Sequence, residues 1–462
     1  MSRFALQRVH WRSTLRWSAL ASAAFLVAMP VRAVPAFARQ TGFDCVTCHL
    51  SWPELTPVGR DFKLGGYTLM QEIRAERPWL SLQADGPPPK LPLAAMLQFS
   101  YTHTRNTAGA DASEFPRNNA AALQQASLFY AGRIAEHLGA FAQWSYDGIA
   151  HHGSIDNIDL RLAGRSAPGG VDTSYGLTIN NNPTVSDIYN ATPAWGFPFA
   201  SSSVAVAPNA ATLIDGGLGQ QVVGAGAYAM WGGTLYTELA AYRTADGAFS
   251  LFRAGTDKST DAVLDGAAPY WRVALQRVWG EGTHSAMIGT YGIEARKFPD
   301  SLDPTGPTDR FRDAAVDAQY QYLTDRHRFS AQATWIREKQ TLDASSASGG
   351  AANTSNELRT FRGKLTYYYD RQYGATLAYF RTTGSADDAL YNTGDPVTGS
   401  ARASPNTDGY VFELDWLPRR DIRLAAQYTA YRNFNGASSD YDGFGRSARD
   451  NDTLYLLTWL MF

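Results

Sequence analysis

The sequence predicts an all-β protein: a transmembrane antiparallel β-barrel of about 16 strands, preceded by a small α-helical domain. Three observations support this prediction: alternating strands behind residue 93, connections sorted by length, and the pattern of the last strand. Aromatic residues make up 13% of the 462-residue chain, which also contains 41 glycines. Behind the N-terminus, no apolar run approaches the roughly 20 residues that a membrane helix needs. Strands must therefore supply any membrane crossing.

Residues 1–33 are predicted to be a secretory signal. Arginines at positions 3, 8, 12 and 16 precede the short apolar stretch Ser18–Met29, and Val31-Arg32-Ala33 offers a cleavage site. Cleavage after Ala38 and an uncleaved amphipathic helix are the alternatives. Without the five arginines of this segment, the 41 basic and 43 acidic residues leave a net charge of about −7. This charge, with no basic patch, excludes nucleic acid as a partner.

Behind Leu93, apolar and polar residues alternate in segments of about ten residues. In the first segment, one face carries Ala95, Leu97, Phe99 and Tyr101, and the other carries Met96, Gln98, Ser100 and Thr102. The candidate strands are residues 94–105, 121–134, 138–148, 156–164, 173–181, 219–231, 234–243, 269–279, 284–296, 310–324, 327–340, 355–369, 373–383, 408–417, 421–433 and 452–462. A soluble β-sandwich would also alternate, so this pattern alone does not decide the fold.

The connections between these strands separate a barrel from a sandwich. Tight links alternate with longer loops, and the tight ones are Ala135–His137, Gly232-Gly233, Gly280–Thr283, Arg371-Gln372 and Pro418–Arg420. Short turns on one rim, long loops on the other and an even strand count are typical of outer-membrane barrels. We therefore expect both termini in the periplasm, and the loops Asn182–Leu218 and Thr244–Ala268 outside.

The last strand also has the pattern of a membrane barrel. Leu454, Leu456, Leu460 and Phe462 share one face, as in the terminal strands by which bacterial outer-membrane proteins are recognised for insertion. Sixteen strands would enclose a lumen wide enough for water or a plug. Its predicted lining includes Gln98, Ser100, Gln125, Ser127 and Gln143.

The only two cysteines of the chain lie in the segment DCVTCH, residues 44–49. Asp44 is a suitable N-cap, and positions i, i+3 and i+4 of a helix share a face, which would bring together Cys45, Cys48 and His49. This Cys-x-x-Cys-His pattern suits one covalent c-type haem: the two thiols add to its vinyl groups and the imidazole binds the iron. A zinc site would need two more close ligands. A redox disulfide would need no histidine and usually follows a strand of a βαβ unit.

The residues behind the motif predict a short second helix. Thr56 is its expected N-cap, Pro57 its first residue and Gly65-Gly66 its end. Val58 and Phe62, four positions apart, could lie against a porphyrin, although a surface helix that only docks the domain is the alternative. Pro87–Pro89 forms a stiff spacer. The predicted domains are thus residues 1–33 (signal), 34–90 (monohaem cytochrome c and linker) and 91–462 (barrel).

Two stretches resemble a known family. FARQTGFDCVTCHLSWPELTPVGRDFKLGGYTL (Phe37–Leu69) and NNNPTVSDIYNATPAWGFPF (Asn180–Phe199) are similar to segments of the fused monohaem cytochrome–porins of bacterial outer membranes. The best-known members are the outer-membrane cytochromes of iron-oxidising bacteria. The resemblance implies one haem c in or against the lumen, anchored by Cys45, Cys48 and the proximal ligand His49. It also implies electron passage between the exterior and the periplasm, although no residue of the sequence selects Fe(II) as the donor.

The second axial ligand of the iron has three candidates: Met70, Met96 on the predicted lumen face, and His103 on the opposite face. Expected partners are outer-membrane lipid, an extracellular redox substrate, and a periplasmic c-type cytochrome or other soluble electron carrier. Two rival functions stay open. One is a small-solute porin with a tethered accessory cytochrome, and the other is a haem-based sensor or reductase whose barrel is an anchor.

Overall fold

The computed structural model describes residues 36–68, 90–107, 115, 117–256 and 262–462. Residues 34–462 belong to one compact unit. The predicted signal, the candidate ligand Met70 and the spacer Pro87–Pro89 lie outside the described residues.

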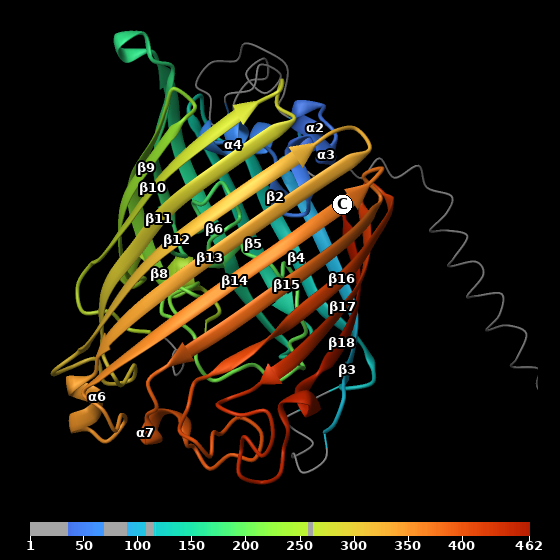
Figure 1. Cartoon of the computed structure of the whole chain (residues 1–462). Coiled ribbons are helices and arrows are strands. Elements are labelled where there is room, and N and C mark those ends of the chain that lie inside the picture. The colour runs from blue at the N-terminus through green and yellow to red at the C-terminus, as the bar shows by residue number, and fades with distance from the viewer. Residues whose placement is uncertain (1–35, 69–89, 108–114, 116, 257–261) are drawn as a thin grey trace, which may run out of the picture. The chain divides into compact units, whose positions relative to one another are not determined.

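Sixteen antiparallel strands close into a barrel (Figure 1), which confirms the predicted antiparallel β-barrel and its strand number. They are β3 (Leu93–Thr104), β4 (Ala121–Arg133), β5 (Leu138–Asp147), β6 (His152–Ser166), β7 (Thr173–Asn180), β8 (Val222–Trp231), β9 (Leu235–Thr244), β10 (Ala268–Trp279), β11 (His284–Lys297), β12 (Asp309–Leu323), β13 (His327–Thr341), β14 (Ser355–Tyr369), β15 (Tyr373–Gly384), β16 (Thr407–Arg419), β17 (Ile422–Asn433) and β18 (Thr453–Met461). Each pairs with its sequence neighbour, and β18 closes the barrel on β3 with Met461 opposite Met96.

The two faces of the strands differ as the alternation predicts. On β3, Met96, Gln98, Ser100 and Thr102 are buried, whereas Phe99 is exposed on the other face. Large apolar side chains are exposed around the outside of the barrel, including Leu128, Leu239, Ile288 and Leu414. Such an outer surface suits contact with lipid, and closure leaves no unpaired backbone edge there. Among the described helices, none is long and apolar enough to cross a membrane.

The connections sort by length between the two ends of the barrel. Short turns join β4 to β5, β8 to β9, β12 to β13 and β14 to β15. The opposite end carries the longer loops, in which the helices α6 (Asp343–Ala347) and α7 (Asp388–Tyr391) lie (Figure 1). One connection at this end, residues 148–151 between β5 and β6, is also short.

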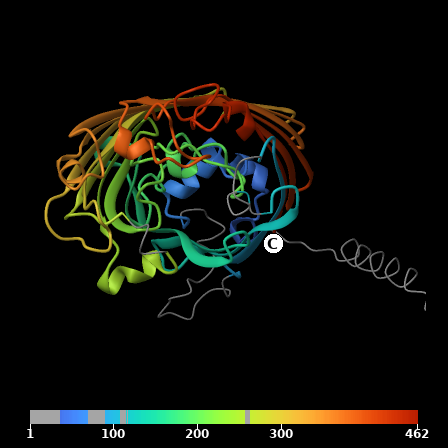
Figure 2. The same cartoon turned by 90° about the horizontal axis from the view of Figure 1, so that it is seen from below.

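The loop between β7 and β8 does not stay outside, and the prediction for Asn182–Leu218 is wrong in this respect. It folds into the lumen (Figure 2), where Val185, Ile188 and Tyr189 are fully buried. The carboxylate of Asp187 accepts hydrogen bonds from the backbone of Tyr189, Ala191 and Thr192, which ties the loop into a compact turn. This inward loop, residues 181–221, then packs against the N-terminal segment.

The N-terminal segment lies inside the barrel near the short-turn end (Figures 1 and 2). It consists of α2 (Ala36–Thr41), α3 (Cys45–Cys48), a hairpin of β1 (His49–Ser51) and β2 (Glu54–Leu55), and α4 (Pro57–Leu64). We call residues 36–68 the plug, because they hydrogen-bond to side chains of Ser285, Asp159 and Lys364 in the lumen and to the backbone of β4 at Ala131.

Candidate cofactor site in the barrel lumen

The cysteine motif begins with a single helical turn. Asp44 has the extended backbone of an N-cap, and its carbonyl accepts from the N–H of Thr47 at 2.9 Å. Its side chain makes no capping bond and instead accepts a hydrogen bond from Arg420. The helix ends at Cys48. The prediction that His49 continues it is wrong, because His49 pairs with Leu55 in the hairpin and has extended backbone.

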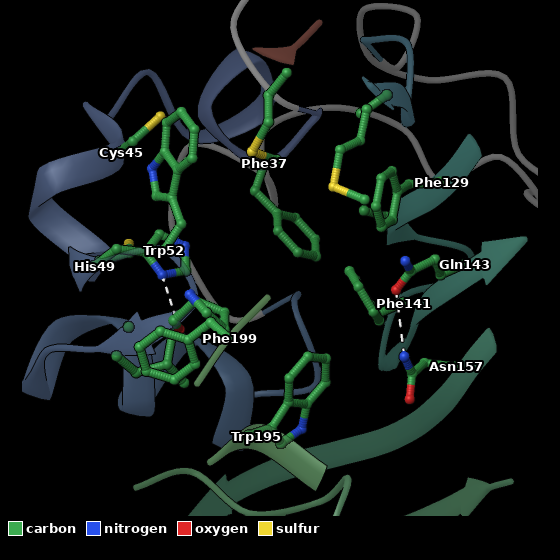
Figure 3. A pocket seen from close by; sticks show the side chains of 18 of the residues that line it. Phe37, Cys45, His49, Trp52, Phe129, Phe141, Gln143, Asn157, Trp195 and Phe199 are labelled. Atoms are coloured by element: carbon green, nitrogen blue, oxygen red, sulfur yellow. Dashed lines mark hydrogen bonds between the residues drawn. The ribbon is translucent and has the colours of Figure 1, made fainter. Parts of the chain in front are cut away.

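Cys45, Cys48 and His49 nevertheless face one cavity of about 410 Å³ inside the lumen. This is within the range of roughly 300–1,000 Å³ that small-molecule and cofactor sites occupy. In Figure 3, Cys45 and His49 lie on one side of the cavity and Gln143 and Asn157 on the other. Between them, the walls are mostly aromatic and come from the plug, the strands and the inward loop: Phe37, Trp52, Phe129, Phe141, Trp195 and Phe199.

The ring of His49 is held in one tautomer. Its Nδ1 lies 3.1 Å from the carbonyl oxygen of Pro53. Because a carbonyl only accepts, Nδ1 carries the proton and Nε2 keeps its lone pair. Burial lowers the pKa of His49, which also favours the neutral ring. A neutral imidazole that donates through one nitrogen to a backbone carbonyl is typical of a metal-ligating histidine.

The two thiols are partly exposed and unbridged. Burial raises the pKa of Cys45, and burial together with the neighbouring Cys45 raises the pKa of Cys48 to about 11. Both are therefore thiols rather than thiolates at neutral pH. Within the described part of the chain, no group of three or more His, Cys, Asp or Glu side chains is arranged to hold a metal ion.

Helix α4 begins and ends as predicted. Thr56 is the N-cap and accepts from the N–H of Gly59, Pro57 is the first residue, and Gly65 is the C-cap. The helix also supports α3, because the N–H of Thr56 donates to the carbonyl of Cys48 at 2.9 Å. Gly59 faces the same carbonyl so closely that a Cβ there would lie 2.2 Å from its oxygen.

The two predicted contacts from α4 have different outcomes. Phe62 is buried and lines the cavity, whereas Val58 is 40% exposed and does not. Two basic residues of the same helix fix it to the barrel and to the inward loop. Arg60 donates to Gln319 and Ser285, and Lys63 donates to the carbonyls of Val185 and Asp187.

Ionic contacts fix the plug to the barrel and to the inward loop. Glu54 is fully buried, pairs with Lys364 at 2.5 Å and also accepts from Gln321. Lys63 also lies over the ring of Trp195, with Nζ 4.9 Å from the ring centre. Burial, and then the charge of Arg161, lowers the pKa of Lys63 to about 7.

The candidates for a second iron ligand are placed differently. Met70 lies outside the described residues, so its prediction stays open. Met96 is buried and lines the cavity. His103 does not line it and instead bonds to Asn119 on the outer side of β3. Met461, which we did not predict, lines the cavity beside Met96.

Two other residues of the cavity, Trp195 and Asp156, were also missed. Trp195 lies within the second of the two stretches on which the family resemblance rests, so that stretch was a usable signal. No sequence signal marks Asp156, because nothing distinguishes it from an ordinary polar residue at the start of a strand. Met461 could have been found from the alternation of β18, which places it on the same face as Trp459.

No protein-family model and no curated protein matches the chain. Among solved structures, it is similar to OmpF of Salmonella typhi in complex with daunomycin, at 12% identity over 80% of this chain and 97% of that chain, with a TM-score of 0.46. The outer membrane channel DcaP of Acinetobacter baumannii is 13% identical over 80% and 96%, with a TM-score of 0.43. The anion-selective porin from Comamonas acidovorans is 11% identical over 80% and 98%, with a TM-score of 0.44. Identities this low concern the fold alone.

Proposed function

We propose that this chain is a bacterial outer-membrane barrel that holds one covalent haem c in its lumen and passes single electrons between an extracellular redox substrate and a periplasmic carrier. The observation that carries the proposal is the convergence of Cys45, Cys48 and His49 on one cavity inside a closed barrel. Two thiols and an adjacent imidazole are the attachment set of a c-type haem.

The residues of the cavity fit such a group. His49 keeps the lone pair of Nε2, and Met96 and Met461 offer thioether sulfur on the same cavity. Trp459 lines the cavity with a buried indole N–H that has no partner among the described residues, so a bound group can accept from it. When bound, haem supplies reversible one-electron chemistry. The chain supplies the anchors, the aromatic walls and the exclusion of water.

The position of the plug supports a role for two partners. In outer-membrane barrels the short turns face the periplasm, so the plug would lie within reach of a periplasmic c-type cytochrome or another soluble carrier. One haem cannot bridge a hydrocarbon core of about 30 Å. An extracellular substrate must therefore enter from the long-loop end. Fe(II) is a candidate donor, although the described residues offer no His, Cys, Asp or Glu cluster for an iron ion.

A second cavity favours an alternative function, the passage of small solutes with the haem segment as an accessory. It measures about 440 Å³ and is lined by β13 to β18. Asn190, Pro193, Gly196 and Pro198 of the inward loop line both cavities, so this loop forms the partition between them. Conductance in a planar bilayer separates the two functions, because an open pore favours solute passage and a closed one favours electron transfer.

Haem staining of the purified protein tests the proposal directly. After denaturing electrophoresis of protein made in a host that matures c-type cytochromes, we expect one haem-stained band. Cys48→Ser should abolish or severely reduce the stain, whereas Thr47→Ser, which keeps both thiols, should leave it. A stain of equal strength in Cys48→Ser would overturn covalent attachment at this motif. Stopped-flow mixing with Fe(II) and with a periplasmic cytochrome then tests the transfer of electrons.

A further inference from the structure

Asp156 is an acid on the wall of the cavity with an unusual position in its strand. The pairing of β5 and β6 shifts register here: Gln143 is opposite Asn157 and Trp144 is opposite Ile155. Asp156 is therefore an extra residue with no partner on β5, and its backbone bulges. It is partly buried and lines the cavity together with Gln125, Gln143 and Asn157.

Every hydrogen-bond donor to this carboxylate is electrically neutral. Oδ1 accepts from Asn157 at 3.2 Å and from Gln220 at 2.7 Å, and Oδ2 accepts from Ser145 at 3.0 Å and from Gln125 at 3.3 Å. These donors come from β4, β5, β6 and the end of the inward loop. Among the described residues, no basic side chain forms an ion pair or hydrogen bond with it. Neutral donors stabilise a carboxylate but supply no opposite charge, and a buried charge without one is costly.

The other titratable side chains that line the cavity have hydrogen-bond partners or belong to the cysteine motif. Asp44 accepts from Arg420, and Tyr67 donates to Asp159. Lys63 is held by two carbonyls of the inward loop and by the ring of Trp195. Cys45, Cys48 and His49 form the attachment motif. Asp156 is thus the acid whose charge balance depends on what occupies the cavity.

We propose that Asp156 binds a proton when the haem of the proposed function is reduced and releases it when the haem is oxidised. The inference rests on that function, because it needs haem in this cavity. The core of an oxidised haem with two neutral ligands carries one positive charge, which compensates the carboxylate. Reduction removes this charge, and the uncompensated carboxylate then takes up a proton.

The step balances as one electron and one proton. A one-electron reductant supplies the electron, which converts Fe(III) to Fe(II). A proton from water binds an oxygen of the Asp156 carboxylate, and the hydrogen bonds to that oxygen rearrange. No bond to the haem forms or breaks. Asp156 is a positioning residue in this scheme, since it sets the potential and its pH dependence without donating electrons.

Redox titration of the full-length holoprotein between pH 5 and 9 tests the inference. In the unaltered protein, the reduction potential should fall with rising pH, with a limiting slope of about 59 mV per pH unit, the one-electron equivalent of a tenfold change. Asp156→Asn should remove this slope. Asp309→Asn is the matched control, because Asp309 is a buried acid with backbone and hydroxyl donors that lies away from the cavity. Its slope should match that of the unaltered protein.

Two further measurements keep the outcomes distinct. Haem staining comes first: an unstained protein overturns the proposed function, whereas a stained Asp156→Asn with an unchanged slope overturns only this inference and assigns the proton to another group. If the pH dependence of the potential disappears in Lys63→Met instead, Lys63 is the group that binds the proton. If Asp156→Asn does not fold, Gln220→Leu removes one donor from the carboxylate. Because loss of a donor disfavours the charged carboxylate, the pH range over which the reduction potential varies should move to higher pH. An unchanged pH range would overturn the inference.

Discussion

Two parts of the lumen wall differ in the charge of their inward side chains. From β10 to β17, buried arginines and carboxylates pair directly: Arg272 with Asp317 at 2.7 Å, and Arg423 with Glu413 at 2.6 Å and with Asp415 at 2.7 Å. From β3 to β5, the side chains that line the cavity are amides and apolar groups. The plug and the inward loop contact the charged wall at these pairs, where Arg423 donates to the carbonyl of Trp52 and Arg272 lies 3.6 Å from Asp187. The neutral wall is left facing the cavity.

This difference indicates that the two walls have different roles: one holds protein segments in place and the other faces the cavity. Ion pairs in a poorly solvated lumen hold protein segments in place, because either partner alone would be a costly buried charge. An apolar cofactor needs the opposite surroundings, aromatic walls with few charges. Disruption of the charged wall should therefore have a larger effect than disruption of the contact between α4 and the cysteine motif, and a change in the titration of Lys63 should have the smallest.

The largest effect is expected at Glu54, which joins the plug to the charged wall. Glu54→Gln keeps the shape of the side chain but leaves Lys364 buried without its counter-ion, a change that costs about 3–5 kcal/mol. We expect the free energy of local opening of the plug to fall by that amount, measured by hydrogen exchange of the α4 amides. The control is Glu294→Gln, which removes the exposed ion pairs with Arg310 and Arg312 and should cost about 0–1 kcal/mol. Equal exchange rates in both variants would contradict the anchoring role of Glu54.

A smaller effect is expected at Gly59, where α4 meets the cysteine motif. Gly59→Ala places a Cβ 2.2 Å from the carbonyl oxygen of Cys48, so helix and motif must move apart. Overpacking of this kind costs about 1–3 kcal/mol. The free energy of plug opening should fall accordingly. If the proposed haem is bound, its spectrum should also shift, because His49 follows Cys48. Gly350→Ala has ordinary contacts at 3.6 Å or more and is the control. An unchanged spectrum with normal plug stability would contradict close packing of α4 on the motif.

These two sites show how far the sequence could predict the molecule. The strands were found because period two and loop length are local signals, and α4 was found because its caps are local as well. The direction of the inward loop was not predictable, because it depends on Asp187 and Tyr189 meeting Arg272 across the lumen. From the sequence, Glu54 is indistinguishable from a surface acid. Its burial follows only from the fold, in which β13 and β14 place Ser330 and Lys364 beside it. Long-range charge pairing leaves no periodic trace in the sequence.

The smallest effect is expected at Lys63, which lies at the boundary of the two walls. Its pKa of about 7 in the folded protein is below the ordinary value of 10.5, because burial opposes its charge. The unfolded state therefore binds more protons between these two values, and the stability of the docked plug should rise as pH rises from about 7 to about 10.5. Lys63→Met cannot titrate, so its plug stability should vary less over this window.

Proteolysis of the inward loop under native conditions measures this difference, because cleavage follows the population of the opened state when opening is fast. We expect cleavage of the unaltered protein to slow as pH rises, and cleavage of Lys63→Met to follow only the pH dependence of the protease on an unfolded substrate. The opposite slope, faster cleavage at higher pH in the unaltered protein alone, would mean that the charged form of Lys63 stabilises the loop. Lys63 would then stay protonated in the folded protein, like the basic residues of the charged wall. The ring of Trp195 would lie against a cation and not against a neutral amine.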